Sequence, residues 1–125
     1  MSHPDWVRAT GIRGALRQQW QELFRDTDVV LCPATPTPAF LHDHSPQRTR
    51  KLEVDGNNIP YLDQIAWAGI ATLTGFPATT APIDRTESGL PIGVQLIGGF
   101  LQDRTTIAFA ELIEREFGGF TPPPL

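Results

Sequence analysis

The residues best suited to chemistry lie together at His42, Asp43, His44 and Ser45. A histidine, an acid and a serine are the groups of a hydrolytic triad, but triads assemble from segments that are distant in sequence. The two histidines could also ligate a metal, yet zinc needs at least three protein ligands, and only Asp43 or His3 could add one. A solvated polar loop is the favoured interpretation, so we predict neither a catalytic residue nor a metal site here.

The remaining reactive side chains are isolated from one another. Cys32 is the only cysteine, so no internal disulfide can form. Reactive cysteines lie beside positive charge, and Cys32 has no basic neighbour in the sequence, so core packing is its favoured role. The stretch Asp55–Asn58 lacks the spaced acidic ligands of a calcium loop and predicts a turn. The chain also has no nucleophilic serine elbow and no phosphate-cradling glycine loop, so residue chemistry alone gives no complete active site.

Composition limits the class of protein. The chain has 125 residues, of which 40% are apolar and 19% charged, and this suits one globular domain with its own core. The net charge of -4 is mild, and the basic run Arg48, Arg50 and Lys51 is too short to predict a nucleic-acid partner. No apolar run reaches the roughly 20 residues of a membrane span, and the N-terminus lacks the apolar core of a signal peptide. We therefore expect a cytoplasmic protein with neither a nucleic-acid nor a membrane partner.

Periodicity and capping residues predict three helices and three short strands within a single segment, residues 1–125. The expected helices cover residues 5–25, 60–73 and 104–117, with Asp5 and Asp103 as caps and Gly75 after the second. The expected strands cover residues 28–32, 78–83 and 92–97. The chain between the first strand and the second helix is polar and predicts a long loop over residues 41–59 or so.

The strand over residues 92–97 raises the question of how it is packed, because it carries Gln95 in an otherwise apolar run. Side chains alternate along a strand, so Leu96 and Ile97 face opposite sides and both faces need a covering layer. An unpaired buried amide costs on the order of 1–3 kcal/mol, so Gln95 must find hydrogen-bond partners. Three such strands are too few to cover themselves. We therefore predict an α/β fold with a partial mixed sheet flanked by helices, belonging to a larger body.

Three sequence blocks resemble the C-terminal part of the amidase signature family: DVVLCPATPTPA from Asp28, TLTGFPATTAPI from Thr72 and GLPIGVQLIGG from Gly89. The resemblance runs from about Trp6 to Phe117. It implies hydrolysis of carboxylic amides by acyl transfer to a serine, assisted by a second serine and a lysine, without a cofactor.

None of those three catalytic residues can be assigned in this chain. The family places them in an upstream segment rich in glycine and serine, whereas this chain has no adjacent serine pair and only one lysine, Lys51. We therefore expect the C-terminal part of an amidase, inactive alone. Its expected partners are the missing N-terminal part and a small amide substrate. The alternative is a non-catalytic binding or interaction protein derived from such a fragment, which covers its apolar surface by self-association.

The family also implies a substrate-binding role for the helix that precedes the Gly75-Phe76-Pro77 block. This places four apolar residues on the acyl side of the substrate pocket: Leu62, Ile65, Ala66 and Gly69. Ordinary core packing of the same residues remains an open alternative. Because Ile65 is not charged, and Thr72 stands where the family has an asparagine, the resemblance favours a neutral or apolar acyl group.

Overall fold

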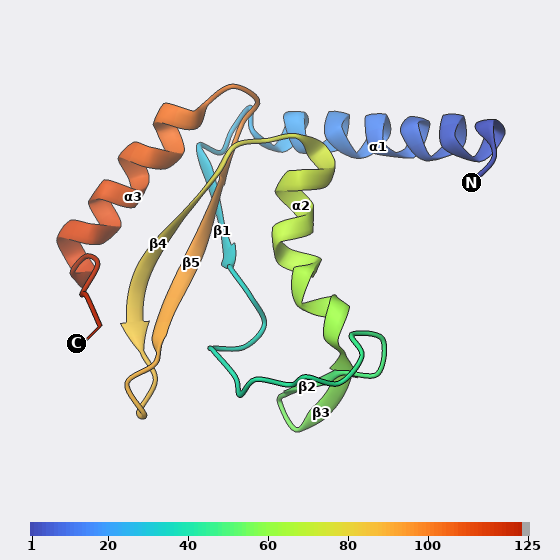
Figure 1. The fold of residues 1–125 in the computed structure, drawn as a ribbon. Coiled ribbons are helices and arrows are strands. Elements are labelled where there is room, and N and C mark those ends of the chain that lie inside the picture. Colours follow the sequence, from blue (N-terminus) through green and yellow to red (C-terminus); the bar gives the residue numbers. More distant parts are fainter. Residues whose placement is uncertain (124–125) are drawn as a thin grey trace.

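A three-stranded antiparallel sheet forms the centre of the molecule (Figure 1). The computed structural model describes residues 1–123. The central strand is β5 (Pro91–Gly98), and it pairs with β1 (Val29–Pro33) on one side and β4 (Ala78–Arg85) on the other. The predicted α/β class and the partial sheet flanked by helices are confirmed. Among the strands of residues 1–123 every pairing is antiparallel, so the parallel pairs of a mixed sheet do not occur between them.

Helices cover both faces of this sheet. Helix α3 (Asp103–Phe117) packs on one face, and α2 (Ala66–Thr74) packs on the other, preceded by the 3-10 turn η1 (Tyr61–Ile65). Helix α1 (His3–Leu23) meets this second face only near its C-terminal end and extends away from the sheet (Figure 1). No helix within residues 1–123 combines the length and the apolar character needed to cross a membrane.

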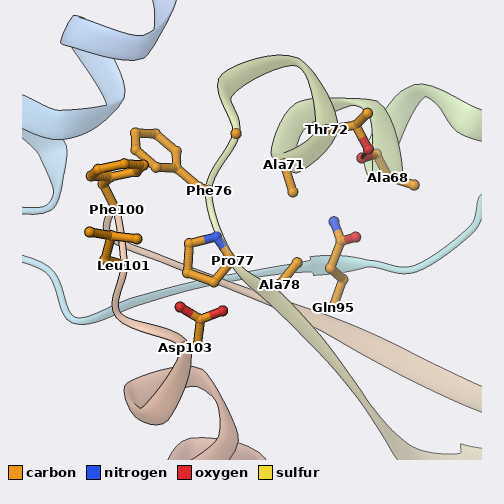
Figure 2. Close-up of a pocket in the computed structure, with 11 residues that line it drawn as sticks. Ala68, Ala71, Thr72, Phe76, Pro77, Ala78, Gln95, Phe100, Leu101 and Asp103 are labelled. Carbon is orange, nitrogen blue, oxygen red and sulfur yellow. Dashed lines mark hydrogen bonds between the residues drawn. The ribbon is translucent and has the colours of Figure 1, made fainter.

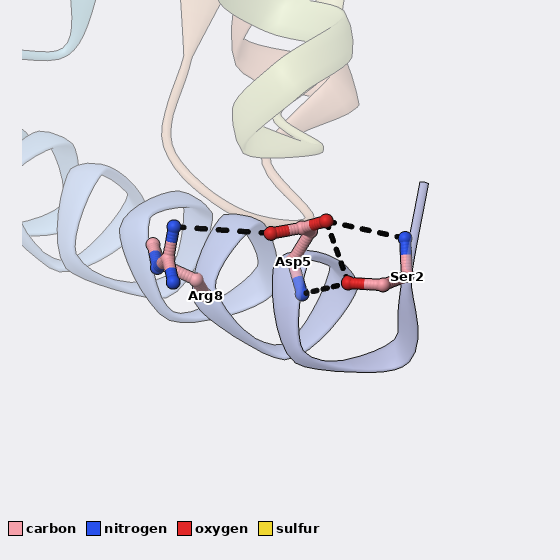
Figure 3. A network of polar contacts seen from close by, with 3 residues as sticks. All are labelled: Ser2, Asp5 and Arg8. Carbon is pink, nitrogen blue, oxygen red and sulfur yellow. Dashed lines mark hydrogen bonds and ion pairs between the residues drawn. The ribbon is translucent and has the colours of Figure 1, made fainter.

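The helix starts differ from the predicted caps. Ser2, not Asp5, is the N-cap of α1, and the two residues form a capping box in which the Asp5 backbone N–H donates to Ser2 Oγ at 3.3 Å (Figure 3). A serine followed by an acid three residues later satisfies two of the free N–H groups at a helix start, which explains the shift. Asp103 is the first helical residue of α3, and Gln102 before it makes no side-chain capping bond.

The core divides into two clusters on opposite faces of β5. Ile97 packs with Cys32, Ala71 and Phe76 on the α2 side, as predicted for a core cysteine. Leu96 packs with Ala81 and Ile113 on the α3 side. Leu96 and Ile97 are adjacent and both are 0% exposed, so the predicted two-sided burial of this strand is confirmed.

The predicted long polar loop is shorter than residues 41–59. Its second half is a hairpin of β2 (Lys51–Val54) and β3 (Asn57–Pro60). Asp55 and Gly56 have φ of 50° and 75°, the left-handed conformation that a two-residue hairpin turn requires. The turn is therefore visible in the sequence, whereas the strands are not, because only Leu52 among their residues is buried.

Candidate functional site

The predicted substrate-facing residues lie on the outer side of η1 and α2. Leu62, Ile65 and Ala66 are exposed and Gly69 is partly buried, whereas Ala71 and Thr74 of the same helix are buried toward the sheet. Leu73 is also exposed and continues this side toward the helix end. We call Leu62, Ile65, Ala66, Gly69 and Leu73 the outer stripe. None of its members belongs to the two core clusters formed by residues 1–123.

Hydrogen bonds hold the C-terminal end of α2. Gly75 adopts a left-handed φ of 72° after the last turn and its N–H donates to Ala71 O at 2.8 Å, as predicted. Arg13 of α1 donates from Nε to the Leu73 carbonyl at 2.7 Å, which satisfies another free acceptor at the helix end. The bond from Arg13 thus ties the C-terminal end of α2, where Leu73 lies, to α1.

Gln95 links α2 to the sheet. Its Nε2 donates to the Trp67 carbonyl of α2 at 3.1 Å and lies 3.2 Å from Cys32 Sγ of β1. The side chain is buried, so these partners answer the prediction that its amide needs them. The carbonyl of Trp67 can only accept, and this assigns the nitrogen of the amide to that side. The oxygen, Oε1, therefore points the other way.

A cavity of about 530 Å³ lies beside this amide, where α2, the start of β4 and the turn before α3 meet (Figure 2). Its walls are mainly apolar and include Ala68, Ala71, Phe76, Pro77, Phe100 and Leu101. Thr72, Gln95 and Asp103 supply the polar side chains that line it. Sequence reasoning singles out Gln95 but misses this cavity. It interprets Asp103 only as a cap, and no sequence pattern indicates that the turn before α3 returns beside α2.

The His42–Ser45 segment forms a compact turn. The Ser45 backbone N–H donates to Asp43 Oδ1 at 2.8 Å, and Arg50 Nε donates to the Ser45 carbonyl at 2.7 Å. Hydrogen bonds from the Ser45 hydroxyl and backbone N–H lower the pKa of Asp43, with smaller contributions from the charges of Arg50 and His44. The segment lines a second cavity of about 390 Å³ together with Phe40 and Tyr61.

This turn lacks the contacts of a catalytic or metal centre. No hydrogen bond joins Ser45 to a histidine within residues 1–123. The rings of His42 and His44 meet edge-on, with their centres 6.2 Å apart. Over the same residues, no group of three or more His, Cys, Asp or Glu side chains is arranged to hold a metal ion.

Comparison with known proteins points to one family. The Amidase family model matches residues 1–107. A glutamyl-tRNA(Gln) amidotransferase subunit from Syntrophus aciditrophicus (strain SB) is 32% identical over 110 residues, which cover 88% of this chain and 21% of that protein. The fatty-acid amide hydrolase 2-A of Danio rerio is 35% identical over 109 residues, which cover 87% of this chain and 18% of that protein.

A solved amidase crystal structure shares the fold. It superposes with a TM-score of 0.81 at 24% identity, over 94% of this chain and 26% of the amidase. The chain thus spans about a fifth of the length of these curated relatives, and about a quarter of the solved structure.

Proposed function

Because the chain belongs to the amidase family, we propose that it supplies the sheet core and one wall of the acyl pocket in an enzyme that hydrolyses carboxylic amides. The serine nucleophile, the second serine and the lysine would come from a segment outside these 125 residues, since the chain has no adjacent serine pair. The resulting reaction is acyl transfer to serine followed by hydrolysis, with no cofactor. We place this enzyme in the cytoplasm.

The outer stripe is the observation that carries the proposal. Leu62 and Ile65 of η1 and Ala66 at the start of α2 present exposed apolar side chains, next to a helix to which Gln95 and Arg13 are hydrogen-bonded. An exposed apolar stripe on a fixed helix suits contact with an apolar group, because burying it there removes apolar surface from water. With no charge at Ile65, a neutral or apolar acyl group fits best. One relative is named a fatty-acid amide hydrolase, and this supports the choice.

Grafting tests this proposal. The matched 109 residues of the Danio rerio relative would be replaced by the corresponding residues of this chain, and hydrolysis of amides with short and long acyl chains would be measured. We expect a folded, active graft in which Ile65→Asp raises KM for long-chain amides at least about tenfold, because burying a charge against apolar surface is unfavourable. Ile107→Asp, at an exposed isoleucine of α3, is the matched control and should leave KM unchanged. A folded but inactive graft, or equal effects of both substitutions, would contradict the proposal.

The chain alone provides a second arm of the test. It should not hydrolyse simple amides. Turnover that survives Ser45→Ala and Lys51→Ala would mean that the chain holds a catalytic site elsewhere, and turnover lost on either change would place the chemistry in the loop and hairpin that carry these residues.

A non-catalytic interaction protein is the second candidate function. It is supported by the exposed apolar residues on α1, among them Trp6, Val7 and Ile12, which lie outside both core clusters. Such surface favours association with another chain, either the remainder of an amidase fold or a second copy. Light scattering separates these cases: a dimer that neither binds the remainder of the Danio rerio relative nor restores its hydrolysis would favour the interaction protein.

A further inference from the structure

We propose that the free edge of β1 pairs with an extended strand that has an apolar face and comes from the part of an amidase outside these 125 residues. Within residues 1–123, β1 pairs only with β5, so its other side is an edge of the three-stranded sheet, like the outer side of β4 (Figure 1). This pairing rests on the proposed function, because the strand would come from the enzyme that the chain helps to form. The backbone and the side chains of the two edges favour β1 over β4.

One hydrogen bond fixes the direction of the backbone groups in the sheet. The N–H of Gly98 in β5 donates to the Pro77 carbonyl at 3.0 Å, on the side of β4. Backbone groups alternate between the two sides of a strand, so those of Ile97, next to Gly98, point to β1. Val30 lies opposite Ile97 and bonds to it. The N–H and C=O of the next residue, Leu31, therefore point to the free edge.

The groups at this edge are unused within the chain that the structure describes. Apart from the pairing with β5, no backbone or side-chain hydrogen bond among residues 1–123 involves the N–H or C=O of Leu31, or those of Val29 two residues before it. A row of unpaired N–H and C=O groups is a template for another strand.

The outer edge of β4 is protected against such pairing, whereas that of β1 is not. Strand β4 contains Pro82, an irregularity in its register between Pro82 and Asp84, and the charged residues Asp84 and Arg85. Proline, bulges and charges are features by which proteins prevent pairing at an edge. Strand β1 has the sequence VVLCP, with no charge and with proline only at its end. A further strand is therefore expected at β1.

The side chain of Leu31 indicates what this strand should offer. Leu31 lies opposite Leu96 in the register, yet it is 51% exposed while Leu96 is 0% exposed. The reason is that α3 packs on Leu96 and lies mainly over β4 and β5. An apolar residue of a neighbouring strand would remove the exposed surface of Leu31 from water. The added strand should therefore be apolar on the face that α3 covers.

The comparison with a solved amidase supports the source of the strand. That protein contains the arrangement of this chain with a TM-score of 0.81 over 26% of its own length, so about three quarters of it lies outside the match. A fold of that size has ample chain to extend the sheet beyond β1. A second copy of the 125-residue chain is the competing occupant, and the test must separate the two.

Hydrogen exchange tests the pairing, with the graft into the Danio rerio relative as the larger protein. In the isolated 125-residue chain the amide of Leu31 should exchange quickly, while that of Val30, bonded to β5, exchanges slowly. In the folded graft the Leu31 amide should exchange at least about a hundredfold more slowly, because a paired amide exchanges only when the strands open. An unchanged rate at Leu31 in the folded graft would overturn the proposal.

Exchange and hydrolysis separate this pairing from the proposed function. A folded but inactive graft with a protected Leu31 amide would contradict the proposed function and support the pairing. An active graft with an unprotected Leu31 amide would do the reverse. If the isolated chain is a dimer by light scattering and its Leu31 amide is already protected, a second copy occupies the edge and the proposal is overturned.

Substitution at the edge gives a test that does not need the graft to fold. The 125-residue chain would be mixed with the remainder of the Danio rerio relative, and formation of a complex would be followed by light scattering. Leu31→Lys should weaken the complex at least about tenfold, because the added strand would bury its charge. Leu112→Lys, at a leucine of α3 that is 56% exposed, is the matched control and should leave the complex unchanged. Absence of a complex with the unmodified chain, or equal effects of the two substitutions, would contradict the pairing.

Discussion

Two isoleucines, one in β5 and one in η1, show how unevenly this molecule covers its apolar residues. Ile97 of β5 is 0% exposed on the side of the sheet that α2 covers, whereas Ile65, the last residue of η1 before α2, is 60% exposed. The residue type is identical, so the difference lies in what surrounds it. Around β5 the 125 residues complete a core by themselves, while the outer stripe and α1 present apolar surface that this core does not use.

The glycines also differ between the closely packed sheet and the exposed helix α1. A Cβ added to Gly98 at the end of β5 would lie 2.6 Å from Cγ2 of Thr106, so only glycine allows α3 to approach this closely. Gly11 and Gly14 in α1 would meet nothing within 4 Å. Glycine inside a helix costs roughly 1 kcal/mol against alanine, and no contact with the other residues of 1–123 explains these two glycines. Close packing therefore accounts for Gly98 but not for Gly11 and Gly14.

The most severe test of this contrast removes the side chain of each isoleucine in turn. Ile97→Ala should lower the free energy of unfolding by about 3–4 kcal/mol, because it leaves a cavity in a closed core. Ile65→Ala should change it by less than about 0.5 kcal/mol, as at other exposed positions. Urea unfolding followed by circular dichroism measures both. A comparable loss at Ile65 would mean that the outer stripe is covered in solution, and light scattering would then reveal the association.

Gln95 tests whether the link between α2 and the sheet contributes to the covered region. Gln95→Leu keeps the approximate shape but removes the donor to the Trp67 carbonyl, so we expect a loss of about 1–3 kcal/mol. Gln18→Leu, at a glutamine of α1 outside the core, is the matched control and should be close to neutral. An unchanged stability for Gln95→Leu would indicate that packing alone holds α2 in place.

The sequence predicts the covered region well because each signal there is local or periodic. The apolar runs around Cys32 and Leu96, the left-handed Gly75 and the need of Gln95 for partners all appear in the structure close to their predicted places. What it misses depends on long-range contacts or weak patterns. The β2–β3 hairpin is polar, and the cavity at Thr72 and Asp103 exists only because separate segments meet.

Substitution of the glycines of α1 tests the same difference in packing, with a smaller expected effect on stability. Gly11→Ala and Gly14→Ala should each stabilise the isolated chain by about 0.5–1 kcal/mol, since both have open space around the added carbon. Gly98→Ala should have the opposite sign, because the side chain of Thr106 is buried and bonded to Thr79 at 2.8 Å and cannot move aside. Thermal unfolding of the three variants is sufficient. Destabilisation by Gly11→Ala would show that another chain already approaches this side of α1.

The smallest expected effect concerns the N-terminal end of α1, where hydrogen bonds at the cap take the place of core contacts. Asp5 accepts from the hydroxyl and the backbone N–H of Ser2, at 2.6 Å and 3.2 Å, and these bonds lower its pKa below the ordinary value of 3.8 (Figure 3). A carboxyl whose pKa is lowered by folding stabilises the helix start above its unfolded pKa, and this stabilisation disappears as the pH falls through the lowered value. Carbon chemical shifts of residues 3–6 should therefore report fraying between about pH 4 and pH 2, while Leu96 and Ile97 keep their native shifts at the start of that change. Asp5→Asn should remove the pH dependence, and Asp26→Asn, beyond the far end of the helix, should preserve it. A first turn that frays only together with β5 would show that α1 is part of the covered region after all.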